Sequence, residues 1–307
     1  MTSFVRANRD TASTRIALSL AFAWSLAVLV PDAATSRAVQ GDAVANIYVV
    51  NLQTGRMTRL THAVDTFFDN AAWVPRGGHI SFSGPSCGDC STASFVVSRA
   101  GARPQRLRTR VLPADRPSWA PGGKRFVFVG GPKGAVYAVD SDGSHLKRLT
   151  HDRASHDEAV WSPNGTTIAY TTQARNGRWD IYTMDPNGRN VRRLTRTPVS
   201  EEEPAWSPDS KKLAFTRQVK GHWSIWVIGA DGRQSKRVTT TRFDEESPAW
   251  APDGRHLAFN RIVRSRVFLF VMNSRGGPAR KVVTGLTRSY RPAFSPDGRE
   301  LAFTGQP

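Results

Sequence analysis

The chain has 307 residues, enough for one large domain or two small domains with a substantial core. Charged residues make up 22% and hydrophobic residues 39%, including 15 Phe and 9 Trp, and this composition excludes a disordered protein. The two cysteines exclude a fold that depends on many disulfides. The formal net charge of +18 indicates that a partner attracted over a long distance is anionic.

The N-terminal segment has the order of a secretory signal. Three basic residues come first: Arg6, Arg9 and Arg15. A mainly apolar stretch over 16–30 and several small residues follow, and we predict a signal peptide over 1–34, cleaved at Ala34 or Ala38. An uncleaved anchor is the alternative, although the apolar stretch is shorter than the roughly 20 residues of a membrane-spanning helix. Cleavage leaves a short linker over 35–43 and a protein exported to the periplasm or the cell exterior.

From residue 44 onwards, one motif recurs six times. Its anchor is a large aromatic residue every 42 to 46 positions: Trp73, Trp119, Trp161, Trp206, Trp250 and Phe294. A proline stands two positions after each anchor, and two large apolar residues follow the turn, two positions apart. A period of two predicts a strand with one buried face, and the longer period is typical of a propeller blade.

Each repeat carries two further strand signals. The third strand is marked by an aromatic residue: Tyr48, Phe95, Tyr137, Tyr182, Trp226 and Phe270. The fourth carries an Arg-Leu-Thr sequence, as at 59–61, 148–150 and 193–195. Four short antiparallel strands therefore make one predicted blade.

The two ends of the repeat region are complementary. The region opens with a third and a fourth strand, at about 46–61, and closes with a first and a second strand, at 292–304. Pairing the N-terminal outer strands with the C-terminal inner strands would close a ring and remove its exposed edges. We therefore predict an all-β fold over 44–307, a six-bladed β-propeller of four-stranded blades.

The repeats also carry a family resemblance. Pro-Ala-Trp-Ser-Pro-Asp-Ser, followed by Leu-Ala-Phe-Thr, occupies 204–216, and a close copy occupies 292–304. These segments resemble the TolB-type, WD40-like β-propeller repeat. The resemblance implies a propeller similar to the C-terminal domain of TolB, without the α/β domain that precedes the propeller there. It leaves function open, because this repeat also occurs in secreted binding proteins and in accessory propellers of peptidases.

A column of acidic residues lies four positions before the anchors. It contains Asp69, Asp115, Asp157, Glu202, Glu246 and, in the last repeat, Tyr290. Because the chain enters the innermost strand there, we expect a ring around one mouth of the central channel, with His156 beside it. Such a ring could accept basic side chains of a protein or peptide, or hold calcium through oxygen ligands. Alternatively, each carboxylate caps backbone amides or pairs with a neighbouring blade, and Arg116 and Arg291 neutralise part of the ring.

The outer strands carry the opposite charge. Each contributes a basic pair: Arg56 and Arg59, Arg106 and Arg108, Lys147 and Arg148, Arg192 and Arg193, Lys236 and Arg237, Arg280 and Lys281. This basic rim favours anionic envelope polymers or a lipid surface. The alternative is a solvated strand edge that charge protects from aggregation. We expect no nucleic-acid partner, because no known nucleic-acid-binding module is visible.

Two cysteines form a short Cys-Gly-Asp-Cys motif, at Cys87 and Cys90. In an oxidising compartment they would close a small disulfide loop. A redox role is less consistent with the surrounding strands, because thioredoxin-type motifs precede a helix. A zinc site would need two further ligands, which the neighbouring sequence does not supply.

Two additional tryptophans occupy equivalent positions in adjacent repeats, three residues before the third-strand aromatic. Trp179 and Trp223 could form a stacking surface for sugar rings or a contact surface for a protein. The alternative is that they pack between adjacent long loops.

Catalytic motifs are missing from the sequence. It has no Gly-x-Ser-x-Gly elbow, no His-Glu-x-x-His and no phosphate-binding glycine loop. We therefore expect a monomeric, non-catalytic scaffold that binds a protein or peptide at the acidic mouth and needs no cofactor. The alternative is a propeller enzyme, a polysaccharide lyase or hydrolase, that uses the mouth carboxylates and His156.

Overall fold

A computed structural model describes residues 44–62, 66–75, 78–85 and 91–307. All of them belong to one compact unit. The expected signal peptide over 1–34, the linker over 35–43 and the cysteines Cys87 and Cys90 lie outside the described residues, so these expectations remain predictions.

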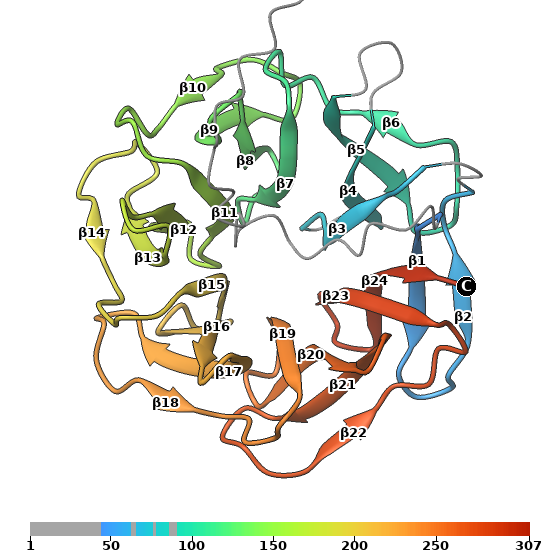
Figure 1. Cartoon of the computed structure of the whole chain (residues 1–307). Coiled ribbons are helices and arrows are strands. Elements are labelled where there is room, and N and C mark those ends of the chain that lie inside the picture. The colour runs from blue at the N-terminus through green and yellow to red at the C-terminus, as the bar shows by residue number, and fades with distance from the viewer. Residues whose placement is uncertain (1–43, 63–65, 76–77, 86–90) are drawn as a thin grey trace, which may run out of the picture. The chain divides into compact units, whose positions relative to one another are not determined.

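Four sheets of four antiparallel strands follow one another along the chain and surround a common centre (Figure 1). The first contains β3 (Asp69–Trp73), β4 (His79–Pro85), β5 (Thr92–Ser98) and β6 (Gln105–Arg106). The second contains β7 (Ala114–Trp119), β8 (Arg125–Gly130), β9 (Ala135–Asp140) and β10 (Lys147–Arg148). The third contains β11 (His156–Trp161), β12 (Ile168–Gln173), β13 (Trp179–Met184) and β14 (Arg192–Arg193). The fourth contains β15 (Glu201–Trp206), β16 (Lys212–Val219), β17 (His222–Gly229) and β18 (Lys236–Arg237).

The other eight strands form a single sheet. They are β19 (Asp244–Trp250), β20 (His256–Val263), β21 (Arg266–Asn273), β22 (Ala279–Lys281), β23 (Arg288–Phe294), β24 (Glu300–Gln306), β1 (Asn46–Asn51) and β2 (Met57–Arg59). The prediction of six separate four-stranded blades is therefore wrong: the described residues form four such blades and one eight-stranded sheet. The cause is a parallel bridge between Val267 of β21 and Arg288 of β23, which joins two sets of four strands.

The predicted pairing of the first strand with the last is confirmed. Six residue pairs, from Asn46–Gly305 to Asn51–Glu300, join β1 to β24 in antiparallel register. Contacts across to the first separate blade complete the circle (Figure 1): Trp73 Nε1 donates to the Ala293 carbonyl (3.0 Å), and Arg99 forms an ion pair with Glu300 (2.5 Å).

The predicted apolar pairs form the core of the sheets. All of them lie on the second strand of their set and are at most 2% exposed: Ile80, Phe82, Phe126, Phe128, Ile168, Tyr170, Leu213, Phe215, Leu257, Phe259, Leu301 and Phe303. Several stack on the third-strand aromatic residue directly opposite, such as Phe82 on Phe95 and Phe303 on Tyr48. Burial of these side chains from water supplies the main stabilisation of each sheet.

The threonine of the Arg-Leu-Thr motif explains why the fourth strands can be so short. Its hydroxyl accepts a hydrogen bond from a backbone N–H of the neighbouring third strand, at 2.9 to 3.0 Å in four repeats: Thr61, Thr150, Thr195 and Thr239. The side chain therefore continues the pairing beyond the last paired backbone residue of the strand, and these four N–H groups of the third strands have a partner.

No helix in the described segments is long and apolar enough to cross a bilayer.

Replacing Phe303 by Ala tests the contribution of ring closure to stability. Phe303 is fully buried on β24 and stacks on Tyr48 of β1, so the Phe303→Ala change is expected to lower the free energy of unfolding by about 3–5 kcal/mol. Urea unfolding followed by tryptophan fluorescence measures the change. The control is Val191→Ala at an exposed position, where the expected change is within about 0.5 kcal/mol.

Candidate functional site

The innermost strands share one backbone irregularity at the predicted mouth. In all of them the antiparallel register shifts directly after the acidic column. The residue at the shift adopts a left-handed conformation, with φ between 50° and 58°: Asn70, Arg116, Glu158, Glu203, Ser247 and Arg291. We call these residues the channel ring. A β-bulge of this kind redirects a side chain, and a left-handed residue other than glycine needs local support.

The acidic column supplies part of that support. Asp115 Oδ1 accepts a hydrogen bond from the backbone N–H of Arg116 (2.7 Å), and Asp157 Oδ1 accepts one from the N–H of Glu158 (2.7 Å). A carboxylate that accepts a backbone N–H stabilises the bulge in the same way as it stabilises a turn. These two residues therefore have the backbone-capping role that the sequence left open as an alternative.

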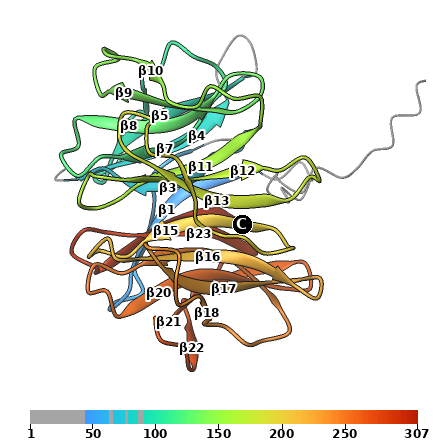
Figure 2. The same ribbon diagram turned by 90° about the vertical axis from the view of Figure 1, so that its left-hand side faces the viewer.

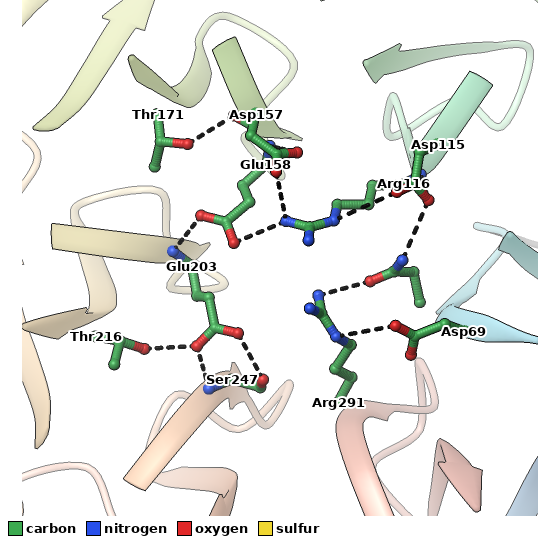
Figure 3. Close-up of polar contacts among 11 residues, drawn as sticks. Asp69, Asp115, Arg116, Asp157, Glu158, Thr171, Glu203, Thr216, Ser247 and Arg291 are labelled. Carbon is green, nitrogen blue, oxygen red and sulfur yellow. Dashed lines mark hydrogen bonds and ion pairs between the residues drawn. The ribbon is translucent and has the colours of Figure 1, made fainter. Parts of the chain in front are cut away.

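A cavity of about 190 Å³ lies at the centre of the innermost strands. The channel ring supplies its polar lining (Figure 3), and the next residue along each strand supplies small or rigid apolar walls: Ala71, Pro117, Ala159, Pro204, Pro248 and Pro292. The predicted column lies one residue earlier in sequence and does not line this cavity. The bulge is the reason, because it turns the residue after the carboxylate toward the channel.

One half of the channel ring is a chain of hydrogen bonds between neighbouring sheets (Figure 3). Arg116 Nη1 contacts Glu158 Oε1 at 2.7 Å and Asp157 Oδ2 at 3.3 Å. Glu158 Oε2 accepts from the Glu203 N–H (2.6 Å), and Glu203 accepts from both the N–H and the hydroxyl of Ser247 (2.6 and 2.8 Å). Each carboxylate therefore links its own strand to the next innermost strand.

The other half of the ring is organised by Arg291. Its guanidinium donates to the Asn70 amide oxygen (2.7 Å) and lies 3.2 Å from Asp69 Oδ2. Asn70 in turn donates to Asp115 Oδ1 (3.2 Å), and Asp69 accepts from the Thr304 hydroxyl (2.8 Å). Asp69 and Asp115 are therefore paired within the protein, as the alternative interpretation of the column expected.

Acidic side chains of β11 and β15 have raised pKa values. Glu202 Oε1 is buried and has no hydrogen-bond partner. Burial raises the pKa of Glu202 to about 10, and the charges of Glu158 and Glu203 add to that rise. Burial also raises the pKa of Glu158 to about 7, although Arg116 opposes the change. The pKa of Asp157 is raised by burial as well.

His156 and Tyr290 are tied to residues outside the cavity. The His156 ring is buried, and its nitrogens lie 2.8 Å from Asp152 Oδ1 and 3.1 Å from the Thr172 hydroxyl. Burial lowers the pKa of His156, so the ring is neutral near pH 7. The Tyr290 hydroxyl donates to Gln306 Oε1 (3.5 Å). Glu246 lies on β19 opposite Asn260 in the backbone register.

Trp179 and Trp223 do not form the exposed aromatic surface that the sequence allowed. Only 4% of Trp179 and 8% of Trp223 are exposed. Each lies at the start of its third strand, paired with the end of the second strand, at Gln173 and Gln218. Both tryptophans are therefore packed within the protein, which was the alternative to a contact surface.

Two buried ion pairs near the mouth were missed by the sequence analysis. Glu201 and Arg217 face each other on β15 and β16 (2.7 Å), and Glu245 and Arg261 do so on β19 and β20 (2.6 Å). Each arginine also lies over a third-strand aromatic ring, at 4.1 and 4.2 Å from its centroid. The signal was present in the sequence, because Glu five positions before the anchor and Arg eleven positions after it occur together in these two repeats.

A metal site is not evident in the part of the chain that the structure describes, since no three His, Cys, Asp or Glu side chains are grouped to hold an ion. A larger cavity, of about 810 Å³, lies between the β15–β18 and β19–β22 strands and is lined by Trp250, Lys212 and Arg255 among others. Its carboxylates, Asp209 and Asp253, accept hydrogen bonds from backbone N–H groups of their own turns.

Comparison with known proteins agrees with the propeller fold described above. Residues 113–246 and 194–307 match the model of the TolB beta propeller domain. A protein assigned as a TolB from Agrobacterium tumefaciens is 23% identical, with a TM-score of 0.73 over 87% of this chain and 99% of that chain. TolB from Acinetobacter baumannii is 20% identical, with a TM-score of 0.60 over 87% of this chain and 65% of that chain. An uncharacterised protein of Agrobacterium fabrum is 33% identical over 92 residues, 29% of this chain and 31% of that protein. The chain thus matches less than two thirds of the length of the last two proteins.

The raised pKa of Glu202 predicts a specific dependence of stability on pH. A carboxyl group whose pKa is higher in the folded state than its ordinary 4.5 favours folding at low pH, and this advantage is lost as pH rises toward about 10. The Glu202→Gln protein should therefore be more stable than wild type at about pH 8, by at least about 1 kcal/mol, and should equal it near pH 4.

Urea unfolding between about pH 4 and 9 measures this difference. The control is Asp297→Asn. Hydrogen bonds from the Ser295 hydroxyl and the Arg299 N–H lower the pKa of Asp297. The difference in the free energy of unfolding between this variant and wild type should therefore stay constant from about pH 5 to 9. Parallel curves for wild type and Glu202→Gln would show that Glu202 is ionised in the folded protein.

Proposed function

The chain belongs to the TolB β-propeller domain family, and from this premise we propose that it is an exported, non-catalytic module that binds a protein or peptide segment at the channel mouth. The order of residues 1–34 supports export. The observation that carries the proposal is the excess of carboxylates on one side of the mouth, together with the buried Glu202 oxygen that has no partner.

A basic side chain is the group that best complements this mouth. Asp157, Glu158, Glu202 and Glu203 lie on two adjacent innermost strands, and Arg116 is the cation that contacts the first two. A lysine or arginine of an inserted segment would bring a second cation, lower the raised pKa values and ionise Glu202. The cavity of about 190 Å³ has room for one such side chain and not for a folded domain.

The position of His156 does not support a role as the general acid or base of an enzyme. Its two ring nitrogens are engaged by Asp152 and Thr172, and it does not line the central cavity. A general acid or base has to reach the reacting atoms directly or through one water molecule. The likeness to TolB structures is at 23% and 20% identity, so it supports the fold and leaves the partner to experiment.

Charge reversal at the mouth tests the proposal. We expect that Glu202→Lys and Glu246→Lys, made together, abolish capture of a partner from an envelope extract by the immobilised protein, because the mouth then repels basic side chains. Mass spectrometry identifies and quantifies the captured proteins. The neutral change Glu202→Gln should weaken capture by a smaller factor, since it removes attraction without adding repulsion.

The matched control is the pair Asp209→Lys and Asp253→Lys, which adds two lysines in place of two acidic residues at the opposite ends of the strands. Unchanged capture by the mouth variant, with an unchanged melting temperature, would contradict the proposal. The capture is repeated with calcium and with a chelator. A requirement for calcium would replace direct recognition of a basic segment by recognition through a bound cation.

A further inference from the structure

The antiparallel sheets have two chemically different ends. In each set of four strands, two connections lie at the end where the innermost strand begins: the one from the second to the third strand, and the one from the fourth strand to the first strand of the next set. The channel ring lies near this same end of the sheets. We call this the mouth end. The connections from first to second and from third to fourth strand lie at the opposite end, the turn end. Figure 2 shows the sheets from the side, with these ends facing opposite ways.

The mouth end is strongly basic. Its connections carry ten exposed basic residues, and an eleventh, Arg266, begins β21 directly after one of them. The ten are Arg108, Arg110, Lys133, Arg153, Arg175, Arg178, Arg196, Lys220, Arg242 and Arg264. None of these has an ion-pair partner among the residues described. Asp152 is the sole carboxylate in the described parts of these connections, and it is already engaged with His156. In the described connections of this end, basic residues therefore far outnumber carboxylates, and the further acidic residues of the end lie on the innermost strands around the channel.

The turn end differs, although it also carries lysines and arginines. Its described connections contain six aspartates: Asp142, Asp185, Asp209, Asp231, Asp253 and Asp297. Most of them accept hydrogen bonds from backbone N–H groups within their own turns, at 2.7 to 3.1 Å. The turn chemistry of the repeat thus places aspartates in the turn-end connections. The exposed connections of the mouth end are mainly basic, and the carboxylates of that end lie on the innermost strands.

Apolar side chains accompany the basic ones at the mouth end. Val283 is 76% exposed and Phe67 is 38% exposed, and both lie in connections from a fourth strand to the next innermost strand. The third large hydrophobic residue that is exposed, Val191, lies at the turn end, just before β14. Exposed apolar side chains within a basic surface are a combination that a lipid headgroup region accommodates.

We infer that the mouth end binds the surface of a bilayer that contains anionic phospholipid. The basic residues come from connections of every separate blade and of the eight-stranded sheet, so they are distributed around the channel rather than along one track. A planar array of lipid headgroups can contact all of these basic residues at once, whereas a single polymer chain would contact only some of them. Each basic residue close to an anionic bilayer adds to the attraction. This inference does not depend on the proposed peptide-binding function.

Co-sedimentation with lipid vesicles tests the inference. The full chain is purified and mixed with vesicles of phosphatidylcholine alone or with about 30% phosphatidylglycerol, at about 0.05 M salt. We expect binding to the anionic vesicles at least about tenfold tighter than to the neutral ones, and its loss at about 0.5 M salt. All variants carry the same N-terminal segment, which therefore contributes equally.

Paired charge reversals locate the surface. Arg175→Glu with Arg264→Glu, at the mouth end, should weaken binding to anionic vesicles by at least about tenfold, whereas Arg233→Glu with Arg275→Glu, at the turn end, should leave it within about twofold. All four residues are exposed, so circular dichroism should show unchanged folding. Val283→Ser removes an exposed apolar side chain. It should weaken the binding to anionic vesicles that remains at salt concentrations between the two used above.

Three results would overturn the inference. Equal binding to neutral and anionic vesicles would remove the electrostatic basis. Equal losses in the two charge-reversal pairs would show that net charge matters and the mouth end does not. Binding to a soluble anionic polymer such as dextran sulfate, without binding to anionic vesicles, would assign the surface to a polymer instead of a bilayer.

Discussion

The antiparallel pairing of β1 with β24 is the constraint on which the rest of the structure depends. The two strands belong to opposite ends of the described chain, and neither the first two nor the last two strands make a four-stranded set alone. Their pairing satisfies the backbone groups of both edges and brings β23 and β3 side by side around the centre. Without that neighbour, Arg291 would have neither Asn70 nor Asp69 to contact, and the channel ring would be open.

The channel ring shows how one backbone device serves two purposes. The bulge in each innermost strand places a side chain over the cavity, and the preceding carboxylate stabilises the left-handed residue by accepting its N–H in at least two repeats. The ring carries two basic, two acidic and two neutral side chains, because the bulge fixes the backbone and leaves the side chain free to vary. The mouth therefore has an acidic side, around Glu158 and Glu203, and a side organised by Arg291.

Much of the fold could be predicted from the sequence, and the reasons for the failures are physical. The period-two apolar pairs, such as Ile80 with Phe82, identified the second strands, because burial on one face is a strong local signal. The number of separate sheets was wrong, because the contact of Val267 with Arg288 depends on the approach of two strands and leaves no mark in composition.

The acidic column predicted from the sequence lies one residue before the residues that line the cavity, and the reason is again structural. The sequence pointed to Asp157 and its equivalents, whereas Glu158 and its equivalents line the cavity. A left-handed residue is usually recognised in a sequence as glycine, and here it is Asn, Arg, Glu or Ser. The capping alternative was predictable from the chemistry of Asp115, but the choice between it and ligand binding required distances between neighbouring sheets.

The paired positions on the first and second strands also constrain how such repeats could be exchanged during evolution. Glu201 faces Arg217 and Glu245 faces Arg261, whereas Ala114 faces Gly130 and Ser289 faces Gly305 at the same register. A recombination event between these strands would leave a buried carboxylate opposite glycine, or an arginine opposite alanine, and uncompensated burial of charge is strongly destabilising. Inheritance of a whole hairpin, and not of a single strand, is therefore the exchange that this architecture tolerates.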